Sequence, residues 1–342
     1  MTTGIGLIGT GIFARNRHAP AISAVADLKL VACANRTLEK ALKFASETAN
    51  IESTKVYTTL DELLADPAVD AIDALLPVQS NLETLKKVIA ANKPISLEKP
   101  IAATLDQARE IVKLASQTDL PVAILENFAH FPVLDDIKNL LSEIGSVIYF
   151  SHYCTAPFNV SSEYLKTSWR LHPEHIGGYL SDGGVHQIAL FTEILGEVES
   201  LSALTTQVRE ESGTVDSMTS TLRMKSGVMG TFTYTSAVSN PRINRMIIHG
   251  TEGSIIFDFS VRSSPTLTLF TNALPAGKPI TIANPDTDGI VAEFTNFSEA
   301  VQSHDKSLLK VTPEKAFHHF AVICAAVESG AKNGETVAIP QP

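Results

Sequence analysis

The chain has 342 residues, more than one hydrophobic core usually serves, so we expect two domains. Hydrophobic residues make up 44% of it and charged residues 19%, which is typical of a globular protein and argues against a largely disordered chain. The formal net charge is −10, with no block of like charge, so we expect no nucleic-acid partner.

The three cysteines lie far apart in the sequence and show no metal-ligand spacing. Their odd number favours a reducing compartment over a disulfide framework. The first residues do not resemble a secretory signal, and no apolar run is long enough to span a membrane. We therefore expect a cytoplasmic protein that has no membrane partner.

In chain order, the first half alternates short apolar strands with helices. The expected strands are residues 5–8, 28–34, 56–57, 71–76, 94–97 and 122–125, and the expected helices are residues 12–25, 38–49, 61–64, 80–92 and 104–117. Strands that alternate with helices are typical of βαβ units, whose right-handed crossovers build a doubly wound parallel sheet.

The second half has a different pattern, in which strands follow one another directly. After a helix near 132–143, strands are expected at residues 146–154, 200–208, 216–224, 228–236, 244–250, 254–258 and 266–270, and helices near 182–195, 290–303 and 313–331. This pattern predicts an α+β domain in which the helices cover one face of a mostly antiparallel sheet. The alternation ends near residue 126, so we predict domains at residues 1–126 and 127–342.

A glycine turn joins the first strand to the first helix. It reads Gly9-Thr10-Gly11-Ile12-Phe13-Ala14. The first glycine permits a tight turn, the second lets a pyrophosphate approach the backbone, and a small third residue lets the helix pack on the strand. The helix N-terminus adds N–H donors and partial positive charge. The first five residues therefore predict a dinucleotide site, although the turn alone also fits a purely geometric role.

The end of the second strand indicates which dinucleotide binds. NAD-binding folds usually place Asp or Glu there to accept hydrogen bonds from the ribose. This chain has Asn35-Arg36-Thr37 instead. Arg36 is suited to a 2′-phosphate, and its two neighbours can add hydrogen bonds. The prediction is NADP(H), and the alternative is that Arg36 is a solvated residue at the start of a helix.

Two further segments carry chemistry. Glu98-Lys99-Pro100 follows a parallel strand, at the edge of the sheet where ligands bind, and the lysine can act as a general acid or hold a substrate oxygen. Asp182 and His186 are four residues apart, so on a helix they face the same side. Histidine can move a proton near neutral pH. We interpret these residues as catalytic, with the glycines at 177, 178, 183 and 184 letting a substrate approach. The alternatives are a surface lysine, a capping aspartate and a packing histidine.

The sequence resembles the glucose-fructose oxidoreductase, inositol dehydrogenase and MocA (Gfo/Idh/MocA) family over nearly its whole length. The resemblance rests on GTGIFA near the start, on Glu98-Lys99-Pro100 and on GGYLSDGGVH at residues 177–186. It is strongest toward a fungal branch of NADP-dependent oxidoreductases, which shares strings such as GTGIFAR and IDALLP. It implies a Rossmann domain followed by an α+β domain with a large, open, mostly antiparallel sheet, through which members form homo-oligomers. We expect a dimer. It also implies that Lys99, Asp182 and His186 form the catalytic group.

The same resemblance adds residues around the cofactor and the substrate. Cofactor contacts are implied for Leu76, Pro77, Asn81, Glu98, Lys99, Asn127, Trp169 and Arg170, and substrate contacts for Lys99, Tyr179, Asp182 and His186. Members often carry a histidine where this chain has Asn81. Pro173 lies between His172 and His175, and no cysteine is near them, so we expect no metal site.

The sequence as a whole predicts an NADP(H)-dependent oxidoreductase. The expected reaction is hydride transfer between the nicotinamide and a CH–OH or carbonyl carbon of a small polar substrate: a sugar, polyol, aldehyde or ketone. His186 or Lys99 would protonate the alkoxide, and Asp182 would orient the group. Reduction of an imine or an ene also fits. The alternative from another class is a catalytically silent NADP-binding regulator of the same fold.

Overall fold

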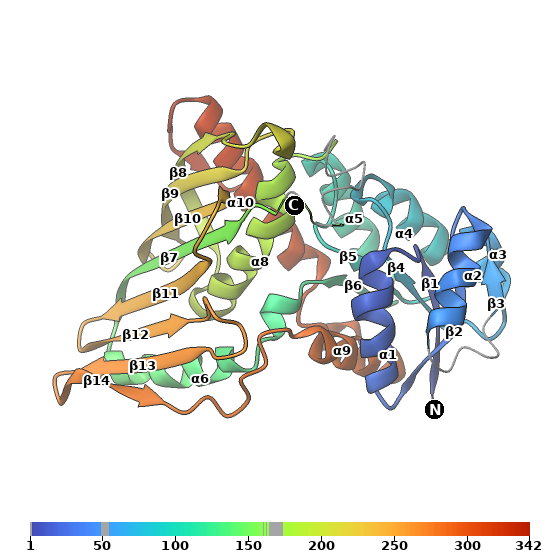
Figure 1. Cartoon of the computed structure of the whole chain (residues 1–342), viewed down its shortest axis with the longest axis horizontal. Helices are drawn as coiled ribbons and strands as arrows, with labels where there is room; N and C mark the ends of the chain where they lie inside the picture. The colour runs from blue at the N-terminus through green and yellow to red at the C-terminus, as the bar shows by residue number, and fades with distance from the viewer. Residues whose placement is uncertain (1, 49–54, 160, 162, 164–173) are drawn as a thin grey trace. The chain divides into compact units, whose positions relative to one another are not determined.

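The computed structural model describes residues 2–48, 55–159, 161, 163 and 174–342 (Figure 1). Contacts divide the chain into two compact units. The first contains the residues up to Asn127 together with Ile290–Phe317, and the second contains Phe128–Gly289 and His318–Gln341. The predicted boundary after residue 126 lies next to the first break, but residues 290–317, predicted in the second domain, belong to the first unit.

The first unit is built on a parallel sheet. Its strands are β1 (Thr3–Ile8), β2 (Leu28–Ala34), β3 (Lys55–Tyr57), β4 (Ala71–Ala74), β5 (Ile95–Glu98) and β6 (Val122–Leu125). They lie in the order β3-β2-β1-β4-β5-β6, and every pair is parallel. The doubly wound sheet is thereby confirmed. The order reverses between β1 and β4, and in such sheets ligands bind beside the carboxyl ends of the strands at this reversal.

Helices connect these strands as the sequence pattern predicts. They are α1 (Ala19–Ala24), α2 (Leu38–Glu47), α3 (Leu60–Ala65), α4 (Asn81–Ala90) and α5 (Leu105–Ser116), with short 3-10 turns at Val78–Ser80 and Lys306–Leu308. Local sequence sets some of the boundaries. For example, Thr59 and Glu62 form a capping box that starts α3.

The helix predicted at residues 12–25 is irregular. Ala14–His18 form a π-helical turn, in which the N–H of Ala19 donates to the carbonyl of Ala14, and only then does α1 begin. Pro20 supplies the cause, because it has no N–H to donate and its ring crowds the carbonyl of residue 16. The wide turn that results ends on His18.

The helix at residues 290–303 was predicted to cover the second sheet, but it packs on the first unit instead. This helix, α9 (Ile290–Ser303), contributes Phe294, Phe297 and Val301 to the core that contains Ile5 of β1 and Ile22 of α1. Figure 1 shows α9 beside α1, and the two are in contact. The amphipathic pattern identified the helix, but it does not specify which of two apolar surfaces the helix covers.

The second unit is built on a nine-stranded sheet. Its strands are β7 (Val147–Pro157), β8 (Val198–Thr206), β9 (Ser217–Met224), β10 (Met229–Val238), β11 (Ile243–Gly250), β12 (Gly253–Asp258), β13 (Thr266–Thr271), β14 (Leu274–Ile280) and β15 (Val337–Ala338). The order is β14-β13-β12-β11-β7-β10-β9-β8-β15, and among the described strands of this sheet only the β7–β10 pair is parallel. The mostly antiparallel sheet is confirmed. β14 was not predicted, because Pro275, Gly277 and Pro279 disfavour a strand, but at the edge of a sheet prolines are tolerated.

The helices of the second unit are α6 (Val133–Leu140), α8 (Gly178–Leu195) and most of α10 (Pro313–Ala331), with 3-10 turns at Asn127–His130, Leu141–Ile144 and Glu210–Ser212. α8 contacts β9 and β10. From α10, His318 Nε2 accepts the N–H of Val198 at 3.0 Å, and Ser329 Oγ accepts that of Ala203 at 2.8 Å. These contacts place α10 against β8.

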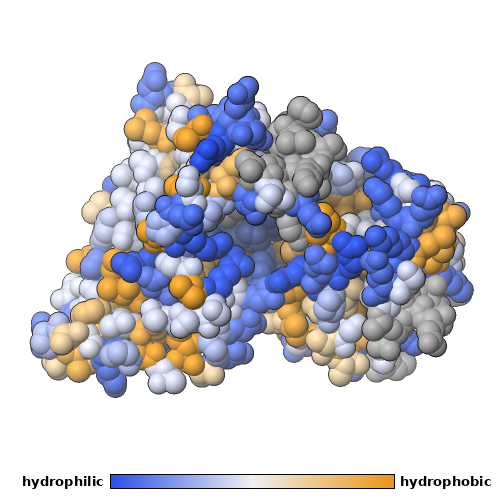
Figure 2. All heavy atoms as spheres, in the orientation of Figure 1, coloured by the Kyte–Doolittle hydropathy of each residue, from blue (hydrophilic) through white to orange (hydrophobic). Residues whose placement is uncertain are grey.

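Hydrophilic side chains predominate on the face seen in Figure 2, and hydrophobic ones are scattered among them. Within the part of the chain that the structure describes, no helix has the length and apolarity required to cross a membrane.

The packing of α9 on the first unit can be tested with Phe294→Ala. This side chain is fully buried, so we expect a loss of about 3–5 kcal/mol in the free energy of unfolding, measured by urea denaturation. Val291→Ala is the matched control, because Val291 is 44% exposed on the same helix. Hydrogen exchange should speed up in β1 and β2 of the Phe294 variant. Faster exchange confined to the nine-stranded sheet would contradict the assignment.

Candidate active site

The glycine turn lies where β1 ends. The N–H of Gly9 donates to the carbonyl of Ala34 at 2.9 Å, and its φ of +99° is one that glycine adopts readily. A Cβ on Gly9 would overlap the carbonyl oxygen of Leu75, the residue after β4. Gly11 is exposed, and a Cβ there would meet nothing within 4 Å. Ala14 is fully buried. The turn thus leaves open space over its second glycine at the strand-order reversal, and this fits a pyrophosphate.

The residues after β2 divide into two roles. Asn35 Nδ2 donates to Thr10 Oγ1 at 3.0 Å, and Asn35 Oδ1 accepts the N–H of Thr37 at 3.0 Å. Asn35 therefore ties its own segment to the glycine turn. Arg36 is exposed and makes no ion pair or hydrogen bond with any described residue. A guanidinium in this position suits a phosphate on the adenosine ribose.

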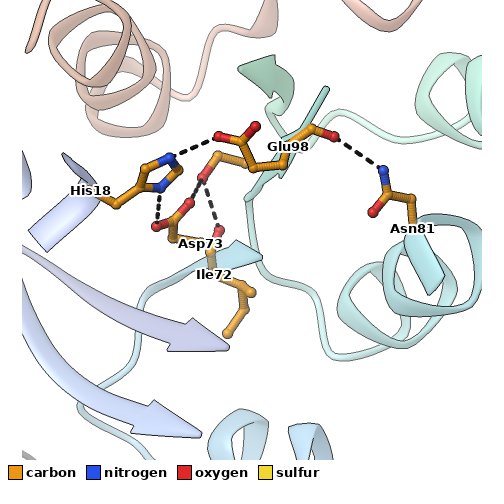
Figure 3. A network of polar contacts seen from close by, with 6 residues as sticks. His18, Ile72, Asp73, Asn81 and Glu98 are labelled. Carbon is orange, nitrogen blue, oxygen red and sulfur yellow. Dashed lines mark hydrogen bonds and ion pairs between the residues drawn. The ribbon is translucent and has the colours of Figure 1, made fainter. Parts of the chain in front are cut away.

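Lys99 follows β5 at the same edge of the sheet, and its backbone is held from one side. Asn81, at the start of α4, is 1% exposed, and its Nδ2 donates toward three carbonyls: Glu98 at 3.1 Å (Figure 3), Pro100 at 3.3 Å and Ile101 at 3.2 Å. The residue that stands in place of the family's histidine therefore clamps the segment that carries Lys99. Cofactor contact by Asn81, and by Leu76 and Pro77 after β4, stays a prediction.

A buried polar cluster behind Lys99 was not predicted from the sequence. His18 lies between the carboxylates of Asp73 and Glu98, and Ser96 donates to Asp73 at 2.9 Å (Figure 3). One signal was present, because Asp73 interrupts the otherwise apolar strand β4 of a sheet buried on both faces. Only the fold shows that a histidine from the first helix reaches this aspartate.

Asp182 and His186 lie on α8, as predicted, but the helix begins earlier than expected. Its first residue is Gly178, and Gly177, with φ of +82°, precedes it. Asp182 therefore belongs to the second turn and does not cap the helix, so the capping alternative is wrong. The spacing of four residues puts both side chains on one side of α8, and both are half-buried.

Two aromatic residues missed by sequence reasoning lie beside this pair. The ring of Phe128 stacks on His186 with centroids 4.7 Å apart, and the guanidinium carbon of Arg262 is 5.3 Å from the Phe128 centroid. Tyr234 is almost fully buried; burial raises the pKa of its hydroxyl well above the ordinary value, and Cys154 and Asp182 add to the effect. Aromatic side chains therefore line part of the surroundings of the pair.

The glycines around α8 have a different role from the one predicted. A Cβ on Gly183 would overlap the hydroxyl of Tyr234, and one on Gly184 would lie 2.9 Å from the side chain of Ile323. A Cβ on Gly177 would lie 2.7 Å from the same isoleucine. These glycines let α8 pack closely on α10 and β10. Substrate access to their backbone stays a prediction.

The remaining predicted residues are distributed as follows. Tyr179 is half-buried with its ring 5.9 Å from that of Phe158, and Asn127 is half-buried after β6. His175 Nε2 lies 3.2 Å from the carbonyl of Gly178, whereas Trp169, Arg170 and His172 lie outside the described residues. Among the residues described, no three His, Cys, Asp or Glu side chains are grouped to hold a metal, and the three cysteines are buried. Lys99 belongs to the first unit and Asp182 and His186 to the second, so their meeting stays a prediction.

Comparison with known proteins identifies the family. The family described as "Oxidoreductase family, NAD-binding Rossmann fold" matches residues 3–125, and the "GFO/IDH/MocA C-terminal domain" matches residues 137–256. An uncharacterized protein of Saccharomyces cerevisiae is 47% identical over 345 residues, covering 99% of each chain. A dehydrogenase of Fusarium mangiferae is 33% identical over 206 residues, covering 57% of this chain and 58% of that one.

A solved structure extends the match to the whole fold. The crystal structure of an oxidoreductase from Thermotoga maritima is 29% identical, superposes with a TM-score of 0.89 and covers 99% of each chain. Both sheets, with the segments that carry the glycine turn and Lys99, therefore belong to a fold that this solved oxidoreductase shares. The chain belongs to the Gfo/Idh/MocA family of oxidoreductases, and residues 3–125 match the Rossmann-fold domain of that family.

Proposed function

We propose that this protein is an NADP(H)-dependent oxidoreductase that transfers a hydride between the nicotinamide and the CH–OH or carbonyl carbon of a small polar substrate. Sugars, polyols, aldehydes and ketones are the candidate substrates. The observation that carries the proposal is that the open glycine turn and the Lys99 segment lie at the same carboxyl edge of one parallel sheet. That edge is where such folds bind dinucleotides and place reactive groups.

The protein's own groups would bind the cofactor and handle the proton. The N–H groups at the start of the helix that follows the glycine turn would hold the pyrophosphate. A bound nicotinamide supplies the redox chemistry. The Lys99 ammonium hydrogen-bonds the substrate oxygen, and either Lys99 or His186 delivers a proton to that oxygen as the alkoxide forms. Asp182 orients the group, and Phe128 restrains the imidazole of His186 by stacking on it.

NADP(H) is proposed over NAD(H) because of the residues after β2. Asn35 stands where an acid would accept hydrogen bonds from the ribose, and Arg36 is exposed without a partner among the described residues. A carboxylate there would repel a 2′-phosphate, whereas a guanidinium attracts it.

We also propose that the protein acts in the cytoplasm as a homodimer that forms through the nine-stranded sheet. Leu204 of β8, Thr219 of β9, Thr233 of β10 and Tyr153 of β7 are successive partners across the sheet, so they share one face. Leu204 is 62% exposed and Tyr153 46% exposed, and a second copy of this face would cover them.

The cofactor preference predicts that Arg36→Ala raises the KM for NADPH about tenfold and leaves that for NADH unchanged, because one charge-assisted contact is lost. Lys40→Ala is the matched control, since it removes a nearby exposed positive charge. The measurement is initial rates with each cofactor. The preference would be refuted if Arg36→Ala changed the KM for both cofactors equally. It would also be refuted if the wild type had the same kcat/KM with NADH as with NADPH.

The catalytic assignment predicts that Lys99→Met and His186→Ala each lower kcat by about 10²–10⁴-fold, the range for lost proton transfer. Affinity for NADPH, measured by fluorescence titration, should stay near the wild-type value. Lys113→Met is the control, because this lysine is exposed on α5. Near-normal turnover in both variants would rule the mechanism out. Tight NADPH binding by the wild type without turnover of any substrate would favour the silent regulator.

The dimer predicts a mass of two chains by size-exclusion chromatography with light scattering. Leu204→Glu combined with Tyr153→Asp should give monomers, because each places a charge on the shared face. A wild-type monomer at micromolar concentration would contradict it.

A further inference from the structure

His18 makes two contacts with carboxylates inside the first unit. It is completely buried, its Nδ1 lies 2.9 Å from Oδ2 of Asp73, and its Nε2 lies 2.8 Å from Oε1 of Glu98 (Figure 3). Glu98 is the last residue of β5, and Lys99 follows it directly. The histidine therefore bridges β4 and the residue that precedes the proposed catalytic lysine.

The geometry indicates the protonation state of this histidine. An ionised carboxylate only accepts hydrogen bonds, so both ring nitrogens must carry a proton for both contacts to form. Burial by itself lowers the pKa of His18, but the charge and hydrogen bond of Asp73, followed by those of Glu98, raise it overall from 6.5 to about 10. The ring is thus an imidazolium at neutral pH.

The groups that face His18 come from several elements. Asp73 lies on β4 and Glu98 on β5, while the rings of Phe13 and Phe294 approach the imidazole edge-on at centroid distances of 5.2 and 5.0 Å. Glu293 of α9 is also buried here.

Glu293 is a further acidic group buried beside His18. Burial raises the pKa of Glu293 well above its usual range, and the nearby Glu98 and Glu126, the latter after β6, raise it further. His18 and its two carboxylate partners therefore lie in a largely buried pocket beside two aromatic rings.

The cluster also connects the two ends of the proposed site. His18 ends the π-helical turn that Pro20 imposes, and this turn follows the glycine turn, with the N–H of Arg15 donating to the carbonyl of Gly11. Asn81 holds the Lys99 segment from the other side (Figure 3). The segment is thus fixed between α4 and the helix that the glycine turn opens.

We propose that His18 is a positioning residue, which as an imidazolium ties the helix after the glycine turn to Glu98 and thereby sets the position of Lys99. The inference rests on the proposed function of Lys99. Removing the tie leaves the backbone donors for the pyrophosphate in place and frees Glu98 to shift. The loss therefore falls on kcat, and NADPH affinity is retained.

The protonation state can be measured in the wild type without any substrate. Among the ten histidines, one should keep both ring N–H groups at pH 9 in ring-¹⁵N NMR, and its signal should be missing in His18→Gln. His152 and His318, whose pKa values burial lowers to about 4, should be neutral there. A spectrum in which every histidine is neutral at pH 9 would overturn the proposal.

Stability gives an independent readout on the protein without cofactor. The folded-state pKa of His18 is raised above its value of 6.5, so its stabilisation is complete below about pH 6.5 and is lost as pH rises toward 10. The urea midpoint of the wild type should fall over this window more steeply than that of His18→Gln. Equal slopes would contradict the charged ring.

Kinetics test whether His18 acts through Glu98. We expect His18→Gln to lower kcat about 10- to 100-fold, the effect of a small misplacement of a reacting group, with NADPH affinity near wild type. In a Glu98→Gln background, His18→Gln should lower kcat little further. His318→Gln is the control for removing a buried histidine far from these residues in the sequence. Unchanged kcat, or a full multiplicative loss in the double variant, would refute the positioning role.

A second variant and the activity of the wild type distinguish a failure of this inference from a failure of the proposed function. If His18→Gln does not fold, Ser96→Ala removes only the hydroxyl that donates to Asp73, and it should show a smaller loss of kcat of the same kind; no loss of kcat in it would count against the role. If none of the tested substrates supports NADPH oxidation by the wild type, the proposed function is overturned. If the wild type is active and His18→Gln has an unchanged kcat, only this inference is overturned.

Discussion

The reversal of strand order between β1 and β4 is the constraint on which the rest of the site depends. Because connections leave this point toward both sides of the sheet, the carboxyl ends of the central strands stay uncovered by crossovers. The glycine turn after β1, Leu75 after β4 and Glu98 at the end of β5 therefore lie along one edge. The absence of a side chain on Gly9 lets the turn pass against Leu75, and Ala14 lets the helix close on the sheet.

Charge inside this domain is arranged around one cation. A buried carboxylate without a partner is costly, and here two carboxylates are satisfied by the two nitrogens of His18, while burial raises the pKa of Glu293 well above its usual range. The same interaction that makes burial tolerable also fixes Glu98. Stability and the placement of Lys99 thus have a common origin, and this links the fold to the chemistry proposed for it.

The sequence predicted well those features that local pattern controls. The alternation of strands and helices gave the parallel sheet, and the segments around Gly9, Lys99 and His186 indicated the family. Long-range contacts were not predictable from one chain. Helix α9 is amphipathic wherever it packs, so its place in the first unit could not be read from residues 290–303. Gly183 and Gly184 were interpreted as substrate access, because the sequence does not show Tyr234 and Ile323 against them. Nothing in the sequence distinguishes His18 from other residues of its predicted helix, because its contacts with Asp73 and Glu98 form only in the folded chain.

The central claim is that a hydride passes between the nicotinamide and a substrate carbon on this protein. The most direct measurement uses NADPH carrying deuterium at both C4 positions of the nicotinamide, with a panel of aldehydes, ketones and sugars, and mass spectrometry of the products. The account predicts an alcohol product that carries one deuterium on the former carbonyl carbon. NADPH that binds, while no product gains deuterium, would contradict the account.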